Sequence, residues 1–316
     1  MAKPRNGEQG PSKSDFQRIM ERAQRRSAKK VEFADARARV ESEAPLSAGS
    51  IIFMSSPLVQ VTIPHSDPGD VRIWSRENGR LTLYIRPGVE ADEDGGHRPM
   101  GLPYGVYPRL ILSWVCSQVA KHGRRRLDLG GSLRSYMRDL GVTPSGGEQG
   151  TERRFREQMR RLFSAHIGMI WQRPGREKRR ATMVADEIDL WWDPKSPASK
   201  TMWESSVQLS RPFYQMIQKR PVPADRRVLK EIKDSALAID LYFWTTYKAA
   251  TIEEPLALSW QQVHDQLGAD YNHISGFARE ARRHLEEIGA IWTGLRYKTP
   301  YGRLVLRPSN PSVPRR

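Results

Sequence analysis

The chain has 316 residues, with 52 Lys and Arg against 36 Asp and Glu, and the resulting net charge of +16 favours a polyanionic partner, most commonly nucleic acid. Its 9% aromatic residues exclude general disorder, and its single cysteine, Cys116, excludes an intramolecular disulfide and a cysteine-based zinc site. No apolar run is long enough to cross a membrane and the first residues lack a signal peptide's apolar core, so we expect a cytoplasmic protein with no membrane partner.

The first hundred residues predict two different kinds of structure. Residues 1–48 are polar and basic, and the composition of 15–40 favours a helix. Its apolar stripe, which starts at Phe16, fades after one or two turns, so we expect a flexible basic arm that becomes helical when it binds a partner. Residues 49–100 predict a β-rich extension with an acidic loop at 91–99. Its expected strands lie at 51–53, 58–63, 71–74 and 80–85, the last two forming a hairpin around Asn78-Gly79.

Residues 101–193 predict a first module of helices followed by a hairpin. A helix at 108–121 ends at Gly123, a short extended piece follows at 127–129, and Ser132 caps a helix at 132–140. A third helix, capped by Thr151, runs to about residue 165. Strands at 167–172 and 181–191 are joined by the basic segment 173–180.

The rest of the chain predicts a connector and a second module of the same order. The connector, 194–224, holds five prolines and one strand-like piece at 207–209. The second module, 225–310, precedes a tail at 311–316. Its expected elements are a helix at 225–250, an extended piece at 256–258, a helix from the cap Ser259 to Leu267 ended by Gly268, a helix at 272–288, and strands at 290–297 and 303–306. This order predicts an α+β fold with two tandem winged-helix domains.

Two stretches of the modules look like copies of one another. The first has Phe155 and Met159, then Arg160-Arg161, and later Gly-Met-Ile-Trp at 168–171. The second has Phe277 and Ala281, then Arg282-Arg283, and later Gly-Ala-Ile-Trp at 289–292. A repeated basic helix followed by a strand indicates two DNA-reading modules in tandem.

The third helix of each module predicts a DNA contact, because its cations lie opposite its apolar stripe. Four of the outward residues of the first helix are arginines with one Glu, whereas a face that serves only solubility usually mixes signs. Arginine can pair with guanine or with phosphates, and Asn272 can read adenine, although an N-cap role for Asn272 is equally good. The helix candidates are Thr151, Arg153, Arg154, Arg156, Arg160, Arg161, Asn272, Ser275, Arg279, Arg282 and Arg283.

The two hairpins predict wings that contact the DNA backbone or minor groove, which raises affinity without reading much sequence. The alternative is an ordinary exposed basic hairpin. The wing candidates are Arg176, Lys178, Arg179, Arg180, Arg296, Lys298 and Arg303.

The sequence predicts no catalytic site, no metal and no cofactor. It has no His-x-His or His-Glu-x-x-His pattern and no phosphate-binding loop, and the acidic cluster at 186–189 suits a solvated strand edge. An enzyme that nicks DNA would need a metal-bound set beside a tyrosine such as Tyr242, Tyr247 or Tyr271.

Three stretches resemble plasmid replication initiators of the RepA type: LPYGVYPRLILSW at 102–114, LDLGGSLRSYMRDLG at 127–141 and SGGEQGTERRFREQMRRLF at 145–163. The resemblance spans roughly residues 50–310, but the connector matches no initiator feature. It implies a non-catalytic protein that binds directly repeated origin sites (iterons) in double-stranded DNA and promotes local opening. It also implies recruitment of the host initiator and the replicative helicase, and a homodimer that represses its own gene. A winged-helix repressor at a palindromic operator stays open as the alternative.

Overall fold

The computed structural model describes residues 13–42, 48–92, 94–190, 205–268 and 271–313, and the chain divides into two compact units, Met1–Pro45 and Leu46–Arg316. In the first unit, α1 (Lys13–Ser42) is one helix of 30 residues. The composition of residues 15–40 favoured a helix, but the fading apolar stripe predicted a flexible arm that becomes helical on binding; the structure has one continuous helix over this range. Ala, Arg, Lys and Glu favour a helix without an apolar stripe, and an i,i+4 ion pair joins Arg37 Nε to Glu41 Oε1 at 2.7 Å.

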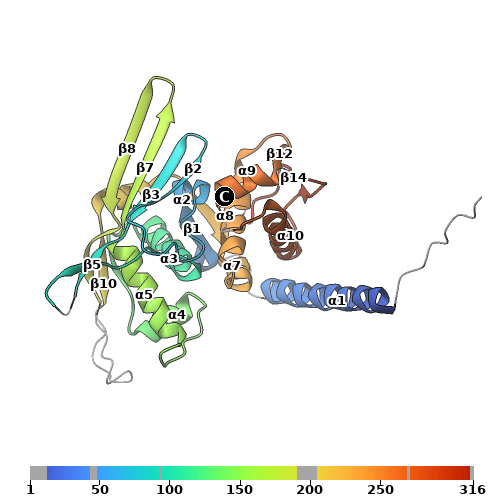
Figure 1. Cartoon of the computed structure of the whole chain (residues 1–316), viewed down its shortest axis with the longest axis horizontal. Coiled ribbons are helices and arrows are strands. Elements are labelled where there is room, and N and C mark those ends of the chain that lie inside the picture. The colour runs from blue at the N-terminus through green and yellow to red at the C-terminus, as the bar shows by residue number, and fades with distance from the viewer. Residues whose placement is uncertain (1–12, 43–47, 93, 191–204, 269–270, 314–316) are drawn as a thin grey trace, which may run out of the picture. The chain divides into compact units, whose positions relative to one another are not determined.

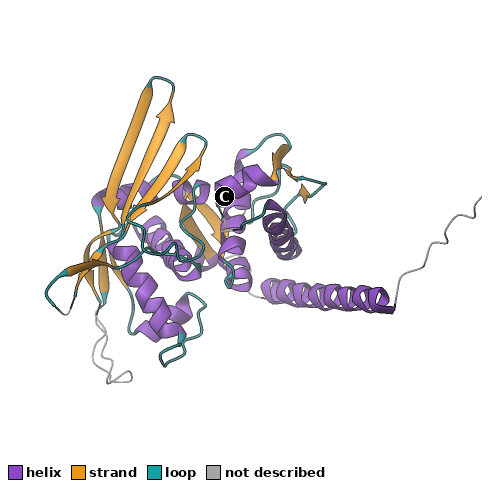
Figure 2. Ribbon diagram, in the orientation of Figure 1, coloured by secondary structure: helices purple, strands orange, loops and turns teal. Residues whose placement is uncertain are grey.

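The second unit combines helices with small antiparallel sheets, as predicted for an α+β fold (Figures 1 and 2). Its helices are α2 (Ser56–Gln60), α3 (Val106–His122), α4 (Leu133–Asp139), α5 (Thr151–Ser164), α6 (Arg211–Gln218), α7 (Arg226–Ile232), α8 (Ala236–Thr251), α9 (Trp260–Leu267) and α10 (Ile274–Ile291), with a 3-10 turn at Ala48–Ser50. Its strands are β1 (Ile51–Ser55), β2 (Trp74–Asn78), β3 (Leu81–Arg86), β4 (Val89–Ala91), β5 (His97–Pro99), β6 (Arg126–Asp128), β7 (His166–Arg173), β8 (Arg176–Met183), β9 (Ala185–Asp189), β10 (Ser206–Leu209), β11 (Pro221–Asp225), β12 (Leu256–Ser259), β13 (Tyr297–Lys298) and β14 (Arg303–Leu306).

The first module has the predicted order α3, β6, α4, α5, β7 and β8. Gly123 ends α3 in the left-handed region at φ 63°, and the Ser132 hydroxyl caps α4 by accepting from the Ser135 amide. Both confirm the predicted boundaries, because each depends on a local backbone bond. Cys116 is fully buried, as predicted, and burial raises the pKa of its thiol to about 12, so the thiol stays protonated.

The predicted β-rich extension is not a separate part of the fold. Strand β3 pairs with β7 from Leu81 opposite Trp171 to Arg86 opposite His166, which makes a sheet in the order β2-β3-β7-β8. Tyr84 lies opposite Gly168, and a Cβ added at Gly168 would overlap the Tyr84 ring. The hairpin at Asn78-Gly79 is confirmed, with Gly79 at φ 58°.

Two strands of the predicted extension were placed wrongly. Residues 58–63 were expected as a strand, but Pro57 lies in the first turn of helix α2, which runs from Ser56 to Gln60. The strand expected at 71–74 begins only at Trp74. The acidic loop at 91–99 is the tip of a hairpin, because β4 pairs with β5.

The connector contributes to the core as well as joining the modules. The predicted strand at 207–209 is confirmed as β10, which is the central strand of the sheet β6-β10-β9. The sequence missed α6 and β11, and β11 pairs with β1 from Ile51 opposite Asp225 to Ser55 opposite Pro221. The predicted connector residues 194–204, and Trp191 and Trp192, lie outside the described residues.

The second module runs α8, β12, α9, α10, β13 and β14, with a sheet in the order β12-β14-β13. The single helix predicted at 225–250 is two helices, because the Ser235 hydroxyl caps a new helix by accepting from the Ala238 amide. Helix α9 confirms its predicted ends, with a capping box at Ser259 and a left-handed Gly268. The strand predicted at 290–297 is mostly helix and turn, since α10 extends to Ile291.

The apparent sequence repeat is therefore only partly a structural repeat. Gly168 to Trp171 lie in strand β7, whereas Gly289 to Ile291 lie in the last turn of α10 and Trp292 follows it. The matching letters reflect similar apolar spacing, which both a strand and a helix end can accommodate. The basic helices α5 and α10 still occupy the same place in the order of their modules.

A buried ion pair joins the two modules. Arg109 of α3, 2% exposed, donates to Asp240 of α8 through Nε at 2.9 Å and Nη2 at 2.7 Å. Its other donors reach the carbonyls of Ile63, Pro64 and Gly105 at 2.7 to 2.8 Å. All guanidinium donors are thus used, which is the condition under which a buried charge is tolerated.

His65 completes this cluster, with Nε2 lying 2.8 Å from Asp240 Oδ2. Burial alone would raise the pKa of Asp240, but Arg109 and His65 outweigh it and the pKa is lowered. Burial and the Arg109 charge lower the pKa of His65, so its ring is neutral at physiological pH. The cluster therefore holds α3 and α8 together as a charged carboxylate and guanidinium.

Candidate nucleic-acid interface

Helix α5 is fixed to the core by one apolar face. Phe155, Met159, Leu162 and Phe163 are fully buried, as the sequence predicted. The Phe155 ring packs edge-on against Tyr107 and Tyr136, at centroid distances of 5.5 and 5.8 Å. The opposite face of α5, which carries the predicted DNA contacts, therefore has a fixed direction.

The turn before α5 uses the Thr151 hydroxyl. Thr151 Oγ1 accepts from the Ser145 amide and donates to the Thr143 carbonyl, both at 2.8 Å. Thr151 is the first residue of the helix, and the N-cap is Gly150. The predicted N-cap role of Thr151 is thus wrong, because its hydroxyl folds the preceding turn instead of capping its own helix.

Replacing Gly150 by alanine is expected to destabilise the protein by about 1–3 kcal/mol. An added Cβ would overlap the backbone carbonyl oxygens of Ser145 and Gly146, which a rotamer change cannot relieve. Urea denaturation followed by circular dichroism measures the effect. Gly131→Ala is the matched control, because its Cβ meets nothing within 4 Å; equal stability of the two variants would contradict the prediction.

The predicted arginines of α5 fall into two groups. Near the start of the helix, Arg153 and Arg154 are exposed, and among the described residues the Arg153 side chain makes one hydrogen bond, from Nη1 to the Glu148 carbonyl at 3.3 Å. Arg154 has no ion pair or side-chain hydrogen bond within the described part of the chain. Arg156 is half-buried, and burial lowers its pKa.

The arginines near the end of α5 are engaged by acidic residues. Arg160 Nη2 lies 3.0 Å from Glu90 Oε2 of β4. Arg161 is only 15% exposed; it pairs with Glu157, lies 3.7 Å from Asp67 Oδ2 and stacks 5.5 Å from the Tyr104 ring centroid. Positive charge is therefore neutralised at this end of α5.

A groove of about 840 Å³ lies between the arginine face of α5 and residues 69–72 and 87–101. Arg72 and Arg98 add to the arginines of α5 along its wall, and Asp70, Glu90 and Glu157 supply the acidic groups. The groove is thus mixed in charge.

The first wing is the hairpin of β7 and β8, which extends away from the helices (Figure 1). Strand alternation and the pairing of Trp171 with Lys178 and Arg173 with Arg176 place these side chains on one face. Arg180 shares this face. Arg179 lies on the other face and pairs with Glu177, which lowers the pKa of that carboxyl.

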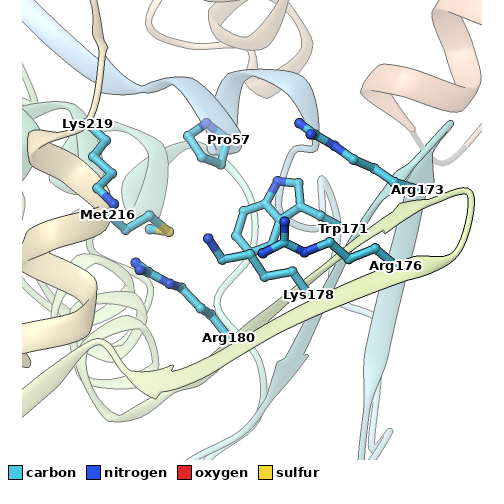
Figure 3. Close-up of a pocket in the computed structure, with 8 residues that line it drawn as sticks. All are labelled: Pro57, Trp171, Arg173, Arg176, Lys178, Arg180, Met216 and Lys219. Carbon is cyan, nitrogen blue, oxygen red and sulfur yellow. The ribbon is translucent and has the colours of Figure 1, made fainter.

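The basic face of this hairpin borders a groove of about 290 Å³ (Figure 3). We call it the Trp171 groove. Figure 3 shows the Trp171 ring in the middle of the set, with the cations of the hairpin on one side and side chains of α2 and α6 on the other. Its lining residues are Pro57, Trp171, Arg173, Arg176, Lys178, Arg180, Met216 and Lys219.

The candidates on α10 are also divided. Ser275 and Arg279 are exposed; Arg279 Nε lies 3.4 Å from Glu280 Oε1, but 76% of the Arg279 side chain remains exposed. Arg282 stacks 4.8 Å from the Trp260 ring centroid, and Arg283 donates to Glu280 and Glu287 at 2.9 Å each. The last two thus serve packing within the module.

Asn272 lies before α10, not in its first turn. The helix begins at Ile274 and its N-cap is His273, so the predicted N-cap role of Asn272 is wrong. Asn272 is exposed and lies just before the start of the helix.

In the second wing, Arg296, Lys298 and Arg303 are exposed around a turn whose Tyr301 is fully exposed.

Sequence reasoning missed five residues of the Trp171 groove, namely Trp171, Arg173, Pro57, Met216 and Lys219. The hairpin register could have revealed the first two, because alternation places them on the face of Lys178 and Arg180. Lys219, at the end of α6, has no sequence signal that connects it with a hairpin more than 30 residues away.

Comparison with known proteins gives a family match and a likeness in fold to a solved structure. A family model described as plasmid encoded RepA protein matches residues 102–262. Among solved structures, the selenomethionine crystal structure of domains 2 and 3 of RctB has a TM-score of 0.51 and 11% identity, covering 82% of this chain and 100% of that one. No curated protein matches the chain. No helix in the described residues is long and apolar enough to cross a membrane.

Proposed function

Since this chain belongs to the family of plasmid-encoded RepA proteins, we propose that it is a plasmid replication initiator that binds directly repeated sites in duplex DNA through two winged-helix modules. The observation that carries the proposal is the recurrence of one arrangement. In each module an exposed arginine on a third helix is followed by a basic hairpin: Arg153 and Arg154 before β7-β8, and Arg279 before β13-β14.

The two third helices, α5 and α10, read successive major grooves on one face of the DNA, about 34 Å apart. The exposed groups Arg153, Arg154, Asn272, Ser275 and Arg279 reach bases and phosphates, and the hairpins contact the backbone or minor groove. The Arg109–Asp240 pair supports this proposal, because it ties α3 to α8 and so fixes the spacing between modules.

Opening of the origin follows from binding without catalysis. Bending or untwisting one site costs on the order of 1–6 kcal/mol. Several copies on adjacent repeats share that cost and favour melting of a nearby weak duplex, where the host initiator and the replicative helicase are recruited. A DNase footprint shorter than one helical turn per monomer would contradict this arrangement.

The test is a binding selection with genomic fragments and the purified full-length protein at about 150 mM salt, where non-specific attraction is weakened. A long asymmetric motif in direct repeats is the expected result. A single palindrome would instead support a dimeric repressor. If no motif is recovered, the arginines form only a general surface for binding polyanions, and the proposal is overturned.

Replacing Glu90 by glutamine is expected to raise duplex affinity about 3- to 10-fold. The substitution removes the carboxylate that holds Arg160 at 3.0 Å and Arg98 at 3.0 Å, so both guanidinium groups become available to phosphates. Fluorescence anisotropy with a labelled site measures the change. Glu253→Gln, in an exposed loop, removes the same charge elsewhere and serves as the control; an equal gain in that variant would refute a local effect.

A further inference from the structure

Within the part of the chain that the structure describes, the cations of the Trp171 groove have no ion-pair or side-chain hydrogen-bond partner. Arg173, Arg176, Lys178, Arg180 and Lys219 form no ion pair or side-chain hydrogen bond with any residue that the structure describes. No acidic residue lines the groove. Five like charges gathered around one hollow repel one another, and a polyanion bound there removes that cost.

This lack of partners distinguishes the groove from α5. There Arg160 and Arg161 face Glu90, Glu157 and Asp67, so the protein itself neutralises them. On the hairpin, Arg179 pairs with Glu177, but both lie on the opposite face of β8. The hairpin thus has one internally paired face and one face with uncompensated charge.

The centre of the groove is aromatic and apolar. The Trp171 ring is partly exposed, and Pro57 of α2 and Met216 of α6 form the facing wall (Figure 3). A volume of about 290 Å³ is near the lower limit of small-ligand pockets. The groove therefore offers a flat π-surface for one planar group, surrounded by cations.

We propose that the Trp171 groove binds single-stranded nucleic acid, with one base stacked on Trp171 and the adjacent phosphates on the surrounding cations. Aromatic rings interleaved with cations are the usual means of holding a single strand, because any base can stack and the backbone supplies the negative charge. A duplex fits less well, since its bases are already stacked and hide their faces from a ring on the side of a hairpin.

This inference deepens the proposed function and rests on it. An initiator that melts a duplex produces single strands, and a strand held on the first wing cannot reanneal. The groove lies on one face of the hairpin and Arg179 lies on the other. The candidate contacts with a single strand are therefore on a different face from Arg179, which is a candidate contact with the duplex.

The experiment measures binding of the full-length protein to a labelled thymidine oligonucleotide of about 20 nucleotides and to a duplex of the selected site. Trp171→Ala is expected to weaken single-strand binding about 10-fold or more while changing duplex affinity less than about 2-fold. Trp171→Phe should retain most of the binding, because it keeps an aromatic face. Lys178→Ala with Arg180→Ala should weaken it and flatten its salt dependence.

Arg179→Ala is the matched control, since it removes a cation from the other face of the same strand and should leave single-strand binding unchanged. Unchanged single-strand binding by the Trp171→Ala variant would overturn the proposal. So would an equal loss for both nucleic acids, or equally tight binding of a poly-glutamate peptide. Wild-type protein that bound single strands but no duplex site would instead remove the proposed function and leave the groove's assignment standing.

If Trp171→Ala lowers the thermal stability of the protein, Trp171→Phe and the double variant of Lys178 and Arg180 test whether the groove binds single strands. Trp171→Phe keeps an aromatic ring at this position, and the double variant changes one exposed side chain, Lys178, and one half-buried side chain, Arg180, both on β8. Single-strand binding that is as strong in the double variant as in the wild type would then exclude the groove.

Discussion

Replacing Asp240 by alanine is expected to lower the free energy of unfolding by about 3–5 kcal/mol, the largest stability effect of any single substitution considered. The loss has a definite origin: the Arg109 guanidinium, 2% exposed, would remain buried without its counter-charge. Equilibrium unfolding in urea measures the difference. The slope of the transition should not change, because the surface exposed on unfolding is the same.

Two further variants give this prediction its controls. Asp234→Ala removes an aspartate that is 90% exposed and lies 3.8 Å from Lys233, and it should cost less than about 0.5 kcal/mol. Arg109→Met with Asp240→Leu should recover only part of the loss, because the carbonyls of Ile63, Pro64 and Gly105 would lose their donor. A loss below about 1 kcal/mol for Asp240→Ala would contradict a structural role for the pair.

Local signals in the sequence placed most helix boundaries of the two modules. Ser132 and Ser259 cap helices, and Gly123 and Gly268 end them, because each acts through hydrogen bonds within one turn of the chain. The Asn78-Gly79 hairpin was predictable for the same reason. These boundaries could be predicted because the deciding contacts are three or four residues apart, although the same kind of signal was misassigned at Thr151 and missed at Ser235.

Pairing between distant segments could not be predicted in this way. The β1-β11 pair joins residues about 170 apart, and β11 contains two prolines that argued against a strand. Pro57 converted an alternating apolar run into helix α2, since the position of proline in a first turn outweighs the alternation. The β1-β11 pair depends on tertiary contacts, which leave no periodic signal in the sequence, whereas Pro57 is a local signal that the alternating pattern concealed.

The same distinction applies to the candidate interface. The arginine face of α5 follows from helical periodicity, and the structure keeps those residues opposite the core. Their neutralisation does not follow, because Asp67 and Glu90 come from segments 70 or more residues earlier than Arg160 and Arg161. The sequence therefore indicated where charge is placed, but not which charges remain free to bind.

Reversing Arg153 and Arg154 together to glutamate is expected to weaken specific duplex binding about 100-fold or more, with an unfolding free energy within about 0.5 kcal/mol of the wild type. Both side chains are exposed, and neither pairs with an acidic side chain of the described residues. If each arginine contacts one phosphate, the negative slope of log K against log salt should become shallower by about 1.8. Titrations at several salt concentrations measure both quantities.

The matched comparison is the double reversal of Arg160 and Arg161. That variant places new carboxylates beside Glu90, Glu157 and Asp67, so it should lose stability as well as affinity. The Arg153 and Arg154 reversal should lose affinity alone, because no acidic partner of the described residues lies against those side chains. Equal duplex affinity for the wild type and the Arg153 and Arg154 reversal would remove the start of α5 from the interface, and the hairpins and α10 would then have to carry all of the specific binding.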